Sequence, residues 1–502
     1  MSLAVFVEAI GVVLGWPVIF WLAAGVLIGI VVGSLPGLGA SLGMAILLPL
    51  TLTLDGTSAI ILLISIYSGA MYGGSIAAIL VNAPGTSAAA ATTFDGYPLS
   101  RQGQAVTALS LSATSSALAG FVTITALIVA SPVLITVVRM FGSPEYFLIA
   151  ILGLAMITIV AQGAMIKGLI AGFFGLSLTT IGSAPMTADV RYTFGQFALF
   201  DGVSFVAALI GLFAIAEMLK LAGERGGISK GDVRMGGDVL PAVKTVLNNP
   251  VTLLKSAFLG MGIGAIPGAG STVSNFVAYT EAVRASDDPD SFGTGNPVGV
   301  IASEASNNGT IGGSVVPAIA FGIPGSAATA VLIGGLIMHG LVPGPELFDA
   351  GGNLVVTYSV FIALLLGNVI ILGVGLGLVT RAGYLTQIDT KYIVPMIIAL
   401  AFLGAFALRS GNWFDVITIV ALGVMGYYMK RYNYSIIAFV LGVVLGSIAE
   451  ENLYRSVILS NRVDFPIDLP VSIFFVRPIS LILLVATVVI LIGPILKPYL
   501  NR

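Results

Sequence analysis

The sequence contains no cysteine, a single histidine and few charged side chains. Without cysteine the chain can form no disulfide, thiol nucleophile or sulfur-ligated metal site, and one histidine excludes a polyhistidine metal centre. Only 9% of the 502 residues are charged, against about 25% in an average soluble protein, whereas 57% are hydrophobic. The net charge of -2 gives no reason to expect nucleic-acid binding.

Long uncharged runs indicate helices that span a membrane. Residues 9–54, 56–94 and 102–138 carry no charged side chain, and each run exceeds the roughly 20 residues that a spanning helix needs. A membrane β-barrel would instead show alternating segments of about ten residues, unlike the unbroken apolar run 396–408. The N-terminus lacks the basic region of a cleaved signal peptide, so we expect the first apolar run to remain as a helix. We predict an all-α polytopic membrane protein with about 10–12 transmembrane helices.

Lysine and arginine are concentrated between residues 217 and 255, which the positive-inside rule places in the cytoplasm. This segment divides the chain into an N-terminal half (1–219), a central cytoplasmic loop (220–255) and a C-terminal half (256–502). By the same rule, residues 381–391, 430–431 and 497–502 lie inside and residues 340–352 and 450–468 outside. The predicted crossings outside the repeat described next are 105–138, 144–161, 164–182, 200–219, 353–380, 392–408, 412–428, 434–449 and 470–495.

Two segments of the chain repeat each other, near 18–104 and near 253–350. Pro36, Gly37 and Gly39 are matched by Pro267, Gly268 and Gly270 at a constant offset of 231 residues. Further on, Pro84-Gly85 resembles Pro324-Gly325 at an offset of 240 residues. The charged loops predict that the first copy begins outside and the second inside, so we expect an inverted repeat, which is common in secondary transporters.

Each Pro-Gly pair should break a helix, because proline lacks an N–H and glycine relaxes the restriction on φ. Backbone groups freed at membrane depth persist only when they are buried in protein or line an aqueous cavity. We therefore expect re-entrant or broken-helix hairpins whose N-terminal ends offer N–H groups to a carboxylate anion. Small hydroxyl and amide side chains adjoin the breaks. The predicted substrate-binding residues are Pro36, Gly37, Gly39, Ser41, Asn82, Pro84, Gly85, Thr86, Ser87, Pro267, Gly268, Gly270, Ser271, Thr272, Asn275, Asn307, Pro324, Gly325 and Ser326.

Neutral oxygens in the same region also suit Na+, a hard cation, for which the nearest candidates are Asn82, Thr86, Asn307 and Ser326; no other metal is expected. A different interpretation applies to small residues at helical spacing. Glycines such as Gly25, Gly29 and Gly33 are typical of close helix packing and need no ligand.

A few ionisable residues stand in or near apolar sequence. Asp95 and Arg101 are interpreted first as a loop ion pair or helix cap, and second as a gating element. Glu304 is a functional candidate if it lies within the membrane, and a solvated interfacial group if it does not. His339 is interpreted as a satisfied interfacial histidine rather than a proton relay.

The motifs resemble a known family. Gly33-Ser-Leu-Pro-Gly-Leu-Gly39 and the run from Asn82 through Asp-Gly-Tyr-Pro-Leu99 to Ala105 are similar to signatures of the large membrane subunit of tripartite tricarboxylate transporters (TctA-like). The resemblance implies a multi-pass protein of the bacterial inner membrane that works with a small membrane subunit and a periplasmic solute-binding protein. It implies uptake of citrate-like tricarboxylates or other organic carboxylate anions, driven by a Na+ or H+ gradient and without a cofactor. Similarity to dicarboxylate carriers further implies an elevator-type secondary transporter.

Other classes of function fit the sequence less well. An enzyme is not expected, because the chain has no cysteine and one histidine from which to build a nucleophile and its base. An ATP-driven pump would need Gly-x-x-x-x-Gly-Lys-Ser/Thr, which is absent. The alternative is an anion-selective channel or a permease acting without a binding protein, since small-residue hairpins also build selectivity filters.

Overall fold

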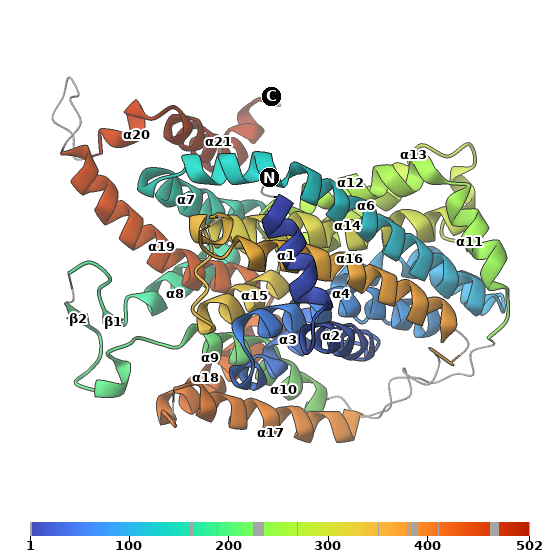
Figure 1. The fold of residues 1–502 in the computed structure, drawn as a ribbon, viewed down its shortest axis with the longest axis horizontal. Helices are drawn as coiled ribbons and strands as arrows, with labels where there is room; N and C mark the ends of the chain where they lie inside the picture. The colour runs from blue at the N-terminus through green and yellow to red at the C-terminus, as the bar shows by residue number, and fades with distance from the viewer. Residues whose placement is uncertain are drawn as a thin grey trace.

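The computed structural model describes residues 3–160, 165–187, 189–223, 235–268, 270–349, 351–378, 381–382, 390–409, 411–461 and 471–500. These residues form a helical protein (Figure 1). Two short strands, β1 (Gly182–Ser183) and β2 (Val190–Arg191), pair antiparallel in a hairpin at one side of the molecule, and they are the only sheet in the described ranges. The prediction of an all-α polytopic membrane protein is confirmed.

The helices of the N-terminal half are α1 (Leu3–Leu14), α2 (Val18–Gly33), α3 (Ala40–Leu47), α4 (Gly56–Val81), α5 (Thr93–Arg101), α6 (Ala105–Met140), α7 (Ser143–Val160), α8 (Met165–Thr179), α9 (Phe205–Leu209) and α10 (Ala216–Gly223). A π-helical segment, Ile210–Ile215, joins α9 to α10, and short 3-10 turns are η1 (Pro49–Thr53), η2 (Ser87–Ala90) and η3 (Phe197–Leu199).

The helices of the C-terminal half are α11 (Val239–Leu247), α12 (Pro250–Gly264), α13 (Gly270–Arg284), α14 (Pro297–Phe321), α15 (Ala327–Met338), α16 (Leu354–Gly377), α17 (Thr390–Leu408), α18 (Trp413–Arg431), α19 (Ile436–Ser460), α20 (Ile473–Val476) and α21 (Pro478–Leu500). Short 3-10 turns are η5 (Pro289–Ser291) and η6 (Pro345–Phe348).

The predicted crossings outside the repeat correspond to helices α6 to α10, α16 to α19 and α21. Among the described residues, five helices are long and apolar enough to span a membrane, or six if the bent pair α1 and α2 forms one span. Several shorter apolar helices accompany them, so the total of 10–12 crossings stays a prediction. The central segment 220–255, predicted as a loop, contains α11, whose Ala242 and Val246 are buried; residues 224–234 lie outside the described part of the chain.

Corresponding helices of the two copies begin and end in similar ways. The Asp55 side chain accepts a hydrogen bond from the Ser58 amide at the start of α4, and Asn296 caps α14 through the Val298 amide. At their other ends, Asn82 closes α4 with φ 54° and Gly322 closes α14 with φ 68°. Both residues adopt the left-handed conformation that ends many helices, where asparagine and glycine are favoured.

Glycines let the helices of each copy pack backbone against backbone. A Cβ on Gly25 would lie 2.7 Å from the Leu62 carbonyl oxygen, and one on Gly33 would meet the Ala70 carbonyl, so α2 can pack this closely on α4 only with glycine there. In the second copy, Gly264 of α12 packs on Thr310 of α14 in the same way. The packing interpretation of these small residues is confirmed.

The two copies form one packed group, in which α6 contacts α14 and α16 contacts both α4 and α6. The whole apolar span of α4 is buried within it. A second group comprises α7, α8, α19 and α21, while α17 and α18 pack on the π-helical segment and α10. In Figure 1, α17 and α18 run along one edge of the molecule and α20 and α21 along the opposite edge.

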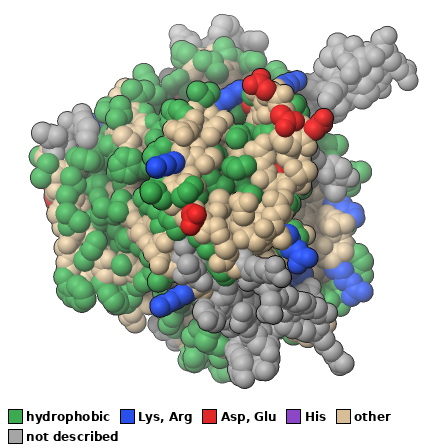
Figure 2. All heavy atoms as spheres, turned by 90° about the vertical axis from the view of Figure 1, so that its right-hand side faces the viewer, with side chains coloured by type: hydrophobic (Ala, Val, Ile, Leu, Met, Phe, Trp, Pro, Cys, Tyr) green, Lys and Arg blue, Asp and Glu red, His purple; other side chains and the backbone are tan. Residues whose placement is uncertain are grey.

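Large apolar side chains cover much of the outside of the molecule. Toward the left of the face in Figure 2, hydrophobic side chains are dense, whereas most of the charged groups lie toward the right. Elsewhere, Phe173 on α8 is 73% exposed and Leu403 on α17 is 69% exposed. Exposed apolar surface on this scale is stable against lipid, which agrees with a membrane protein.

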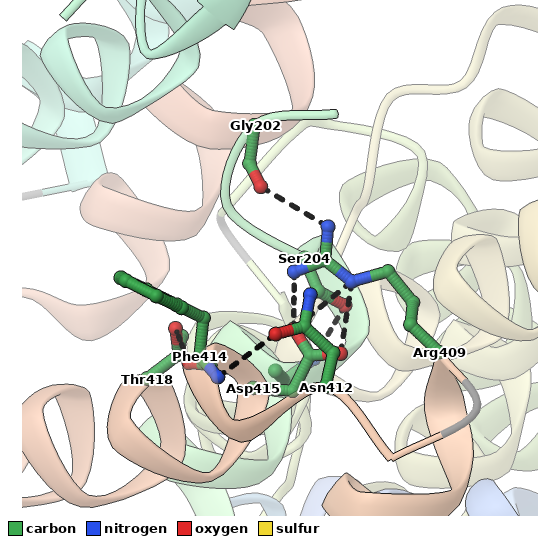
Figure 3. A network of polar contacts seen from close by, with 8 residues as sticks. Gly202, Ser204, Arg409, Asn412, Phe414, Asp415 and Thr418 are labelled. Atoms are coloured by element: carbon green, nitrogen blue, oxygen red, sulfur yellow. Dashed lines mark hydrogen bonds and ion pairs between the residues drawn. The ribbon is translucent and has the colours of Figure 1, made fainter. Parts of the chain in front are cut away.

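A buried ion pair joins the end of α17, the start of α18 and the loop before α9 (Figure 3). Asp415 is fully buried, and the Nε of Arg409 donates to both of its carboxylate oxygens, at 3.1 and 2.9 Å. The Nη1 of the same guanidinium donates to the carbonyl oxygen of Gly202 at 3.2 Å. Because one side chain satisfies both a buried carboxylate and a loop carbonyl, it fixes three segments together.

Replacing Arg409 by glutamine should therefore lower the free energy of unfolding by about 3 kcal/mol, because Asp415 would remain buried without its counter-charge. The matched control is Arg139→Gln, whose partner Asp349 is 61% exposed; that change should cost less than about 1 kcal/mol. Thermal unfolding of the purified protein in detergent measures both. Equal losses in the two variants would show that the buried pair has no special role.

Candidate functional site

The four Pro-Gly breaks meet around one cavity of about 750 Å³. The segments that follow the breaks, namely α3, η2, α13 and α15, each contribute their first residues to its wall. The lining residues are Gly37, Gly39, Ala40, Ser41, Tyr67, Met71, Pro84, Gly85, Thr86, Ser87, Ala88, Glu217, Lys220, Ile266, Gly268, Gly270, Ser271, Thr272, Val273, Ser326, Ala327, Ala328, Lys430 and Ile437. The N-terminal end of a helix carries N–H groups without intrahelical partners, so this wall is rich in backbone donors.

The first break of each copy depends on glycines in the left-handed region. Gly37 has φ 86°, and Gly268 and Gly270 have φ 74° and φ 60°. Side chains other than glycine rarely adopt this conformation, which turns the chain between α2 and α3 and between α12 and α13. At the restart of α3, Gly39 is the N-cap and provides no side-chain hydrogen bond, so the first amides of α3 remain available.

The second break of each copy packs against the end of the helix before the first break. A Cβ on Gly85 would collide with the Gly33 carbonyl oxygen, and one on Gly325 would lie 2.7 Å from the Gly264 carbonyl oxygen. Gly33 and Gly264 are equivalent positions of the repeat, so the same contact is made twice. This contact brings the two breaks of one copy together.

Side-chain hydrogen bonds join the breaks of different copies. The Thr272 hydroxyl donates to the Ser87 hydroxyl at 2.9 Å, and the Asn275 side-chain amide donates to the carbonyl oxygen of Ala88 at 2.7 Å. Tyr67 of α4 bonds to Ser314 of α14 at 3.1 Å. The wall of the cavity is therefore one structure built from both copies.

A cluster of three charged residues, which no Pro-Gly motif indicates, stands at the cavity. Glu217 of α10 is buried, and its carboxylate is paired with Lys430 of α18 and, at 3.3 Å, with Lys220. Two ammonium groups share one carboxylate, so the cluster contributes a net positive charge. Both lysines are exposed, and they lie at the ends of α10 and α18 that the positive-inside rule predicts to be cytoplasmic.

Most of the predicted substrate-binding residues lie in this wall. They are Gly37, Gly39, Ser41, Pro84, Gly85, Thr86, Ser87, Gly268, Gly270, Ser271, Thr272 and Ser326. The cavity wall does not include Pro36, Asn82, Pro267, Asn275, Asn307, Pro324 or Gly325.

Several of the predicted residues outside the wall support it from behind. The Asn307 side-chain amide donates to the carbonyl oxygen of Met71 at 3.0 Å, just as Asn275 holds Ala88. Asn82 is exposed and ends α4, a role that its equivalent Gly322 fills without a side chain. The left-handed backbone conformation at the end of α4 therefore explains the asparagine at this position, and its side chain is not part of the cavity wall.

The wall also contains residues that sequence reasoning missed, namely Tyr67, Met71, Glu217, Lys220 and Lys430. In the sequence, Lys220 and Lys430 indicate only which ends of their helices are cytoplasmic. Neither lies in a segment of the repeat, so the motifs do not connect them to the breaks. The spacing of Glu217 and Lys220 by three residues on an apolar helix was an available signal, because such residues are neighbours on one helix face.

The ionisable candidates have definite partners. Asp95 is buried and bonds to the second copy rather than to Arg101: it accepts the amides of Gly293, Gly295 and Asn296, at 2.7 to 2.9 Å, and the Tyr279 hydroxyl at 2.8 Å. The expected ion pair with Arg101 is therefore wrong. A carboxylate with four donors already has the partners that burial requires.

The remaining two candidates differ in their surroundings. The His339 ring lies 3.0 Å from the Thr51 hydroxyl, as expected for a satisfied histidine. Glu304 is completely buried in α14, which excludes the interpretation as a solvated interfacial group.

Substitutions at two glycines of this site distinguish a glycine needed for packing from one that only lines the cavity. Gly85→Ala should cost about 3 kcal/mol of stability, because its methyl group meets a backbone carbonyl that cannot turn aside. Gly39→Ala should cost less than about 1 kcal/mol, since a Cβ there meets nothing within 4 Å and φ is -61°. Thermal unfolding in detergent tests both, and a stable Gly85→Ala protein would contradict the packing described here. Gly39 is consequently the better position at which to add bulk to the cavity.

Comparison with known proteins identifies the family. Residues 19–441 match the tripartite tricarboxylate transporter TctA family. The chain is 34% identical over 494 residues, 95% of this chain and 94% of the relative, to an uncharacterized 52.8 kDa protein in the TAR-I ttuC' 3' region of Agrobacterium vitis. It is 29% identical over 225 residues, 45% of this chain and 89% of the relative, to an uncharacterized protein in the TAR-II ttuC' 3' region of the same organism. No solved structure matches. The chain therefore belongs to the tripartite tricarboxylate transporter TctA family, a family of multi-pass membrane subunits of transporters.

Proposed function

We propose that this chain is the large transmembrane subunit of a binding-protein-dependent secondary transporter that imports tricarboxylates, such as citrate, or other organic carboxylate anions. The observation that carries the proposal is the cavity in which the helix ends of all four breaks meet a lysine pair. Its volume of about 750 Å³ lies within the range of about 300–1,000 Å³ typical of small-molecule sites.

The wall has the chemistry that a carboxylate needs. Unpaired N–H groups and the positive ends of the helix dipoles of α3 and α13 favour an anion. Ser41, Ser87 and Ser326 add neutral hydroxyl groups, which donate hydrogen bonds without fixing one anion shape. Lys220 and Lys430 add positive charge that Glu217 only partly neutralises. A substrate with several carboxylate groups can reach several of these donors at once.

The conformation described by the structure corresponds to an inward-facing state in this proposal. The two lysines lie at the exposed side of the cavity, which is the side predicted to be cytoplasmic. An elevator motion would carry the packed group of the two copies past the group of α7, α8, α19 and α21. Helices of the two groups contact each other much less than helices within each group do, which supports this motion.

A Na+ or H+ gradient supplies the driving force in this proposal. Of the four residues predicted near Na+, Thr86 and Asn307 carry a buried side-chain oxygen with no hydrogen-bond partner among the described residues. Asn82 is exposed, and the Ser326 side chain accepts the Thr329 amide in the capping box of α15. Thr86 and Asn307 are therefore the better candidates for cation ligands of that set. The partners are a small membrane subunit and a periplasmic solute-binding protein, in the bacterial inner membrane.

The proposal is tested by uptake of labelled citrate into vesicles that contain the chain with its small membrane subunit and are supplied with the binding protein. Accumulation should require both the binding protein and an imposed inward Na+ or H+ gradient. Uptake that needs neither would favour the alternative, an anion-selective channel or a permease acting without a binding protein.

Charge substitutions at the lysine pair should change affinity in opposite directions. Lys430→Gln should raise the KM for citrate about tenfold, because it removes a cation from the cavity, whereas Glu217→Gln should lower KM by freeing both lysines. The matched control is Lys255→Gln, which breaks an exposed pair with Glu281 outside the cavity and should leave KM unchanged. Initial rates of uptake over a range of citrate concentrations measure all three. Equal KM values for wild type and Lys430→Gln would remove the lysine pair from the site.

A further inference from the structure

Glu304 lies in a cage of hydroxyl groups in the middle of α14. It is 0% exposed, and each of its carboxylate oxygens accepts two hydroxyl hydrogen bonds. Ser75 donates to Oε1 at 2.7 Å together with Thr92, while Ser112 and Ser116 donate to Oε2 at 3.0 and 2.8 Å. The donors come from α4, from the segment after η2 and from α6, so the cage joins two parts of the first copy and the helix that follows it to one helix of the second copy.

The cage contains no positive charge. No lysine or arginine forms a hydrogen bond or ion pair with Glu304 in the described ranges, whereas the buried carboxylates Glu145, Glu217 and Asp415 each pair with at least one. Asp95 is also buried without a cation, but three of its four donors are backbone amides of the segment that leads into α14. Hydroxyl donors stabilise a carboxylate but leave its charge in the membrane interior, where an isolated charge is costly. A small cation is the simplest partner that cancels this charge.

The surroundings offer further oxygen ligands. Asn308, one helical turn from Glu304, donates its side-chain amide to the Ser116 carbonyl at 2.9 Å and to Asn368 at 3.0 Å. Its own side-chain oxygen is buried and has no partner among the residues that the structure describes. A buried acceptor without a donor calls for a specific explanation, and a bound cation provides one.

The repeat itself does not account for Glu304. The offset of 239 residues that relates Gly73 to Gly312 also relates Ser65 to Glu304, so the first copy has a hydroxyl where the second has a carboxylate. A group needed only for packing two equivalent helices would not require this difference. The carboxylate is therefore present in the second copy alone, as expected for a binding group that is needed once.

The chain itself and one close packing contact connect the cage to the wall of the anion cavity. Thr92 follows η2, whose first residues Ser87 and Ala88 line the cavity. Ser75 follows Gly74, against which the wall residue Thr86 packs so closely that a Cβ on Gly74 would lie 2.5 Å from the Thr86 hydroxyl oxygen. Glu304 therefore holds the chain on both sides of this wall segment, at Ser75 before it and at Thr92 after it.

We propose that Glu304, within its cage of Ser75, Thr92, Ser112 and Ser116, is the site that binds the coupling cation and links it to the anion cavity. This assignment rests on the proposed function of anion symport. The shared chemistry is a monovalent cation, H+ or Na+, that neutralises the carboxylate. A proton would add to one carboxylate oxygen, and a hydroxyl group that donated to that oxygen would turn to accept the new O–H. Na+ would instead take carboxylate, hydroxyl and amide oxygens as ligands.

The other titratable groups near the cage are either neutral or hydrogen-bonded or ion-paired elsewhere. Tyr72 on α4 is buried and interacts electrostatically with Glu304, and a tyrosine hydroxyl is neutral across the ordinary pH range. Asp95 on α5 already holds its donors, including Tyr279 of α13. The charged residues of α6 and α12 are in exposed pairs, Arg139 with Asp349 and Lys255 with Glu281. Among the described residues of this region, Glu304 is the buried carboxylate whose donors are all hydroxyl groups, without a backbone amide or a cation.

The test uses the full chain reconstituted with its small membrane subunit and supplied with the binding protein, and labelled citrate as the probe. Two rates are measured: accumulation driven by an imposed gradient, and exchange of citrate across vesicles preloaded with citrate, without a gradient. Glu304→Gln should lower gradient-driven accumulation at least tenfold and leave exchange within about twofold of wild type. The matched control Glu346→Gln, an exposed carboxylate in η6, should leave both rates unchanged.

Separate arms with only a pH gradient and only a Na+ gradient identify the cation. Glu304→Gln should lose the response to whichever gradient drives the wild type. Full accumulation by this variant would overturn the assignment while the proposed function stands. A wild-type complex that accumulates neither citrate nor any other organic carboxylate that its binding protein binds, under either gradient, would overturn the proposed function and, with it, the role of Glu304.

A second variant covers the case in which Glu304→Gln does not fold. Ser112→Ala removes one donor from Oε2, so the ionised carboxylate is less well stabilised. The cation concentration at half-maximal uptake should change by about tenfold, the scale of one hydrogen bond to a charged group. If the cation is H+, this concentration should fall, because the less stabilised carboxylate binds a proton more readily. If the cation is Na+, it should rise, because Na+ loses a hydroxyl ligand. An unchanged value would place Glu304 outside the cation step.

Discussion

In the interior of a membrane, each backbone amide and carbonyl group released by a helix break needs a new partner, and the rest of this structure depends on how that need is met. Glycine makes the solution possible. Gly85 packs on the carbonyl of Gly33, and Gly325 packs on that of Gly264, at distances that any side chain would prevent. The broken ends are thereby gathered at one point, where their remaining amides face a cavity instead of lipid.

The duplicated parts of the molecule supply the scaffold, and unique residues supply the charge. Both copies have the same two breaks and the same close packing of their first two long helices. The charges lie elsewhere: Glu217 and Lys430 come from helices outside the repeat, and Glu304 replaces the Ser65 of the first copy. A symmetric framework can thus present a positive group and a negative group in different places, because each is present in one copy or outside the repeat.

Much of the fold could be predicted because the membrane restricts the possible structures. A long apolar run must become a helix when no water can satisfy its backbone, so the predicted crossings outside the repeat agree with the helices. Helix α11 was not predicted, because its short amphipathic sequence lies in a charged segment where composition favours a loop. The partners of Asp95 could not be predicted either, since they lie about 200 residues away, in the loop between α13 and α14.

By itself, the sequence determined that this is a helical membrane protein of the TctA type, with a repeat and four helix breaks flanked by hydroxyl groups. These properties follow from local chemistry, namely apolar length, the missing N–H of proline and the freedom of glycine. Only the tertiary structure decided that the four breaks share one cavity, that Asn275 and Asn307 stand behind its wall, and that Glu217, Lys220 and Lys430 complete it. It also decided that Glu304 is caged by hydroxyls from the other copy and from α6. The reason is that contacts between distant segments are set by how whole helices pack, which no local pattern in the sequence records.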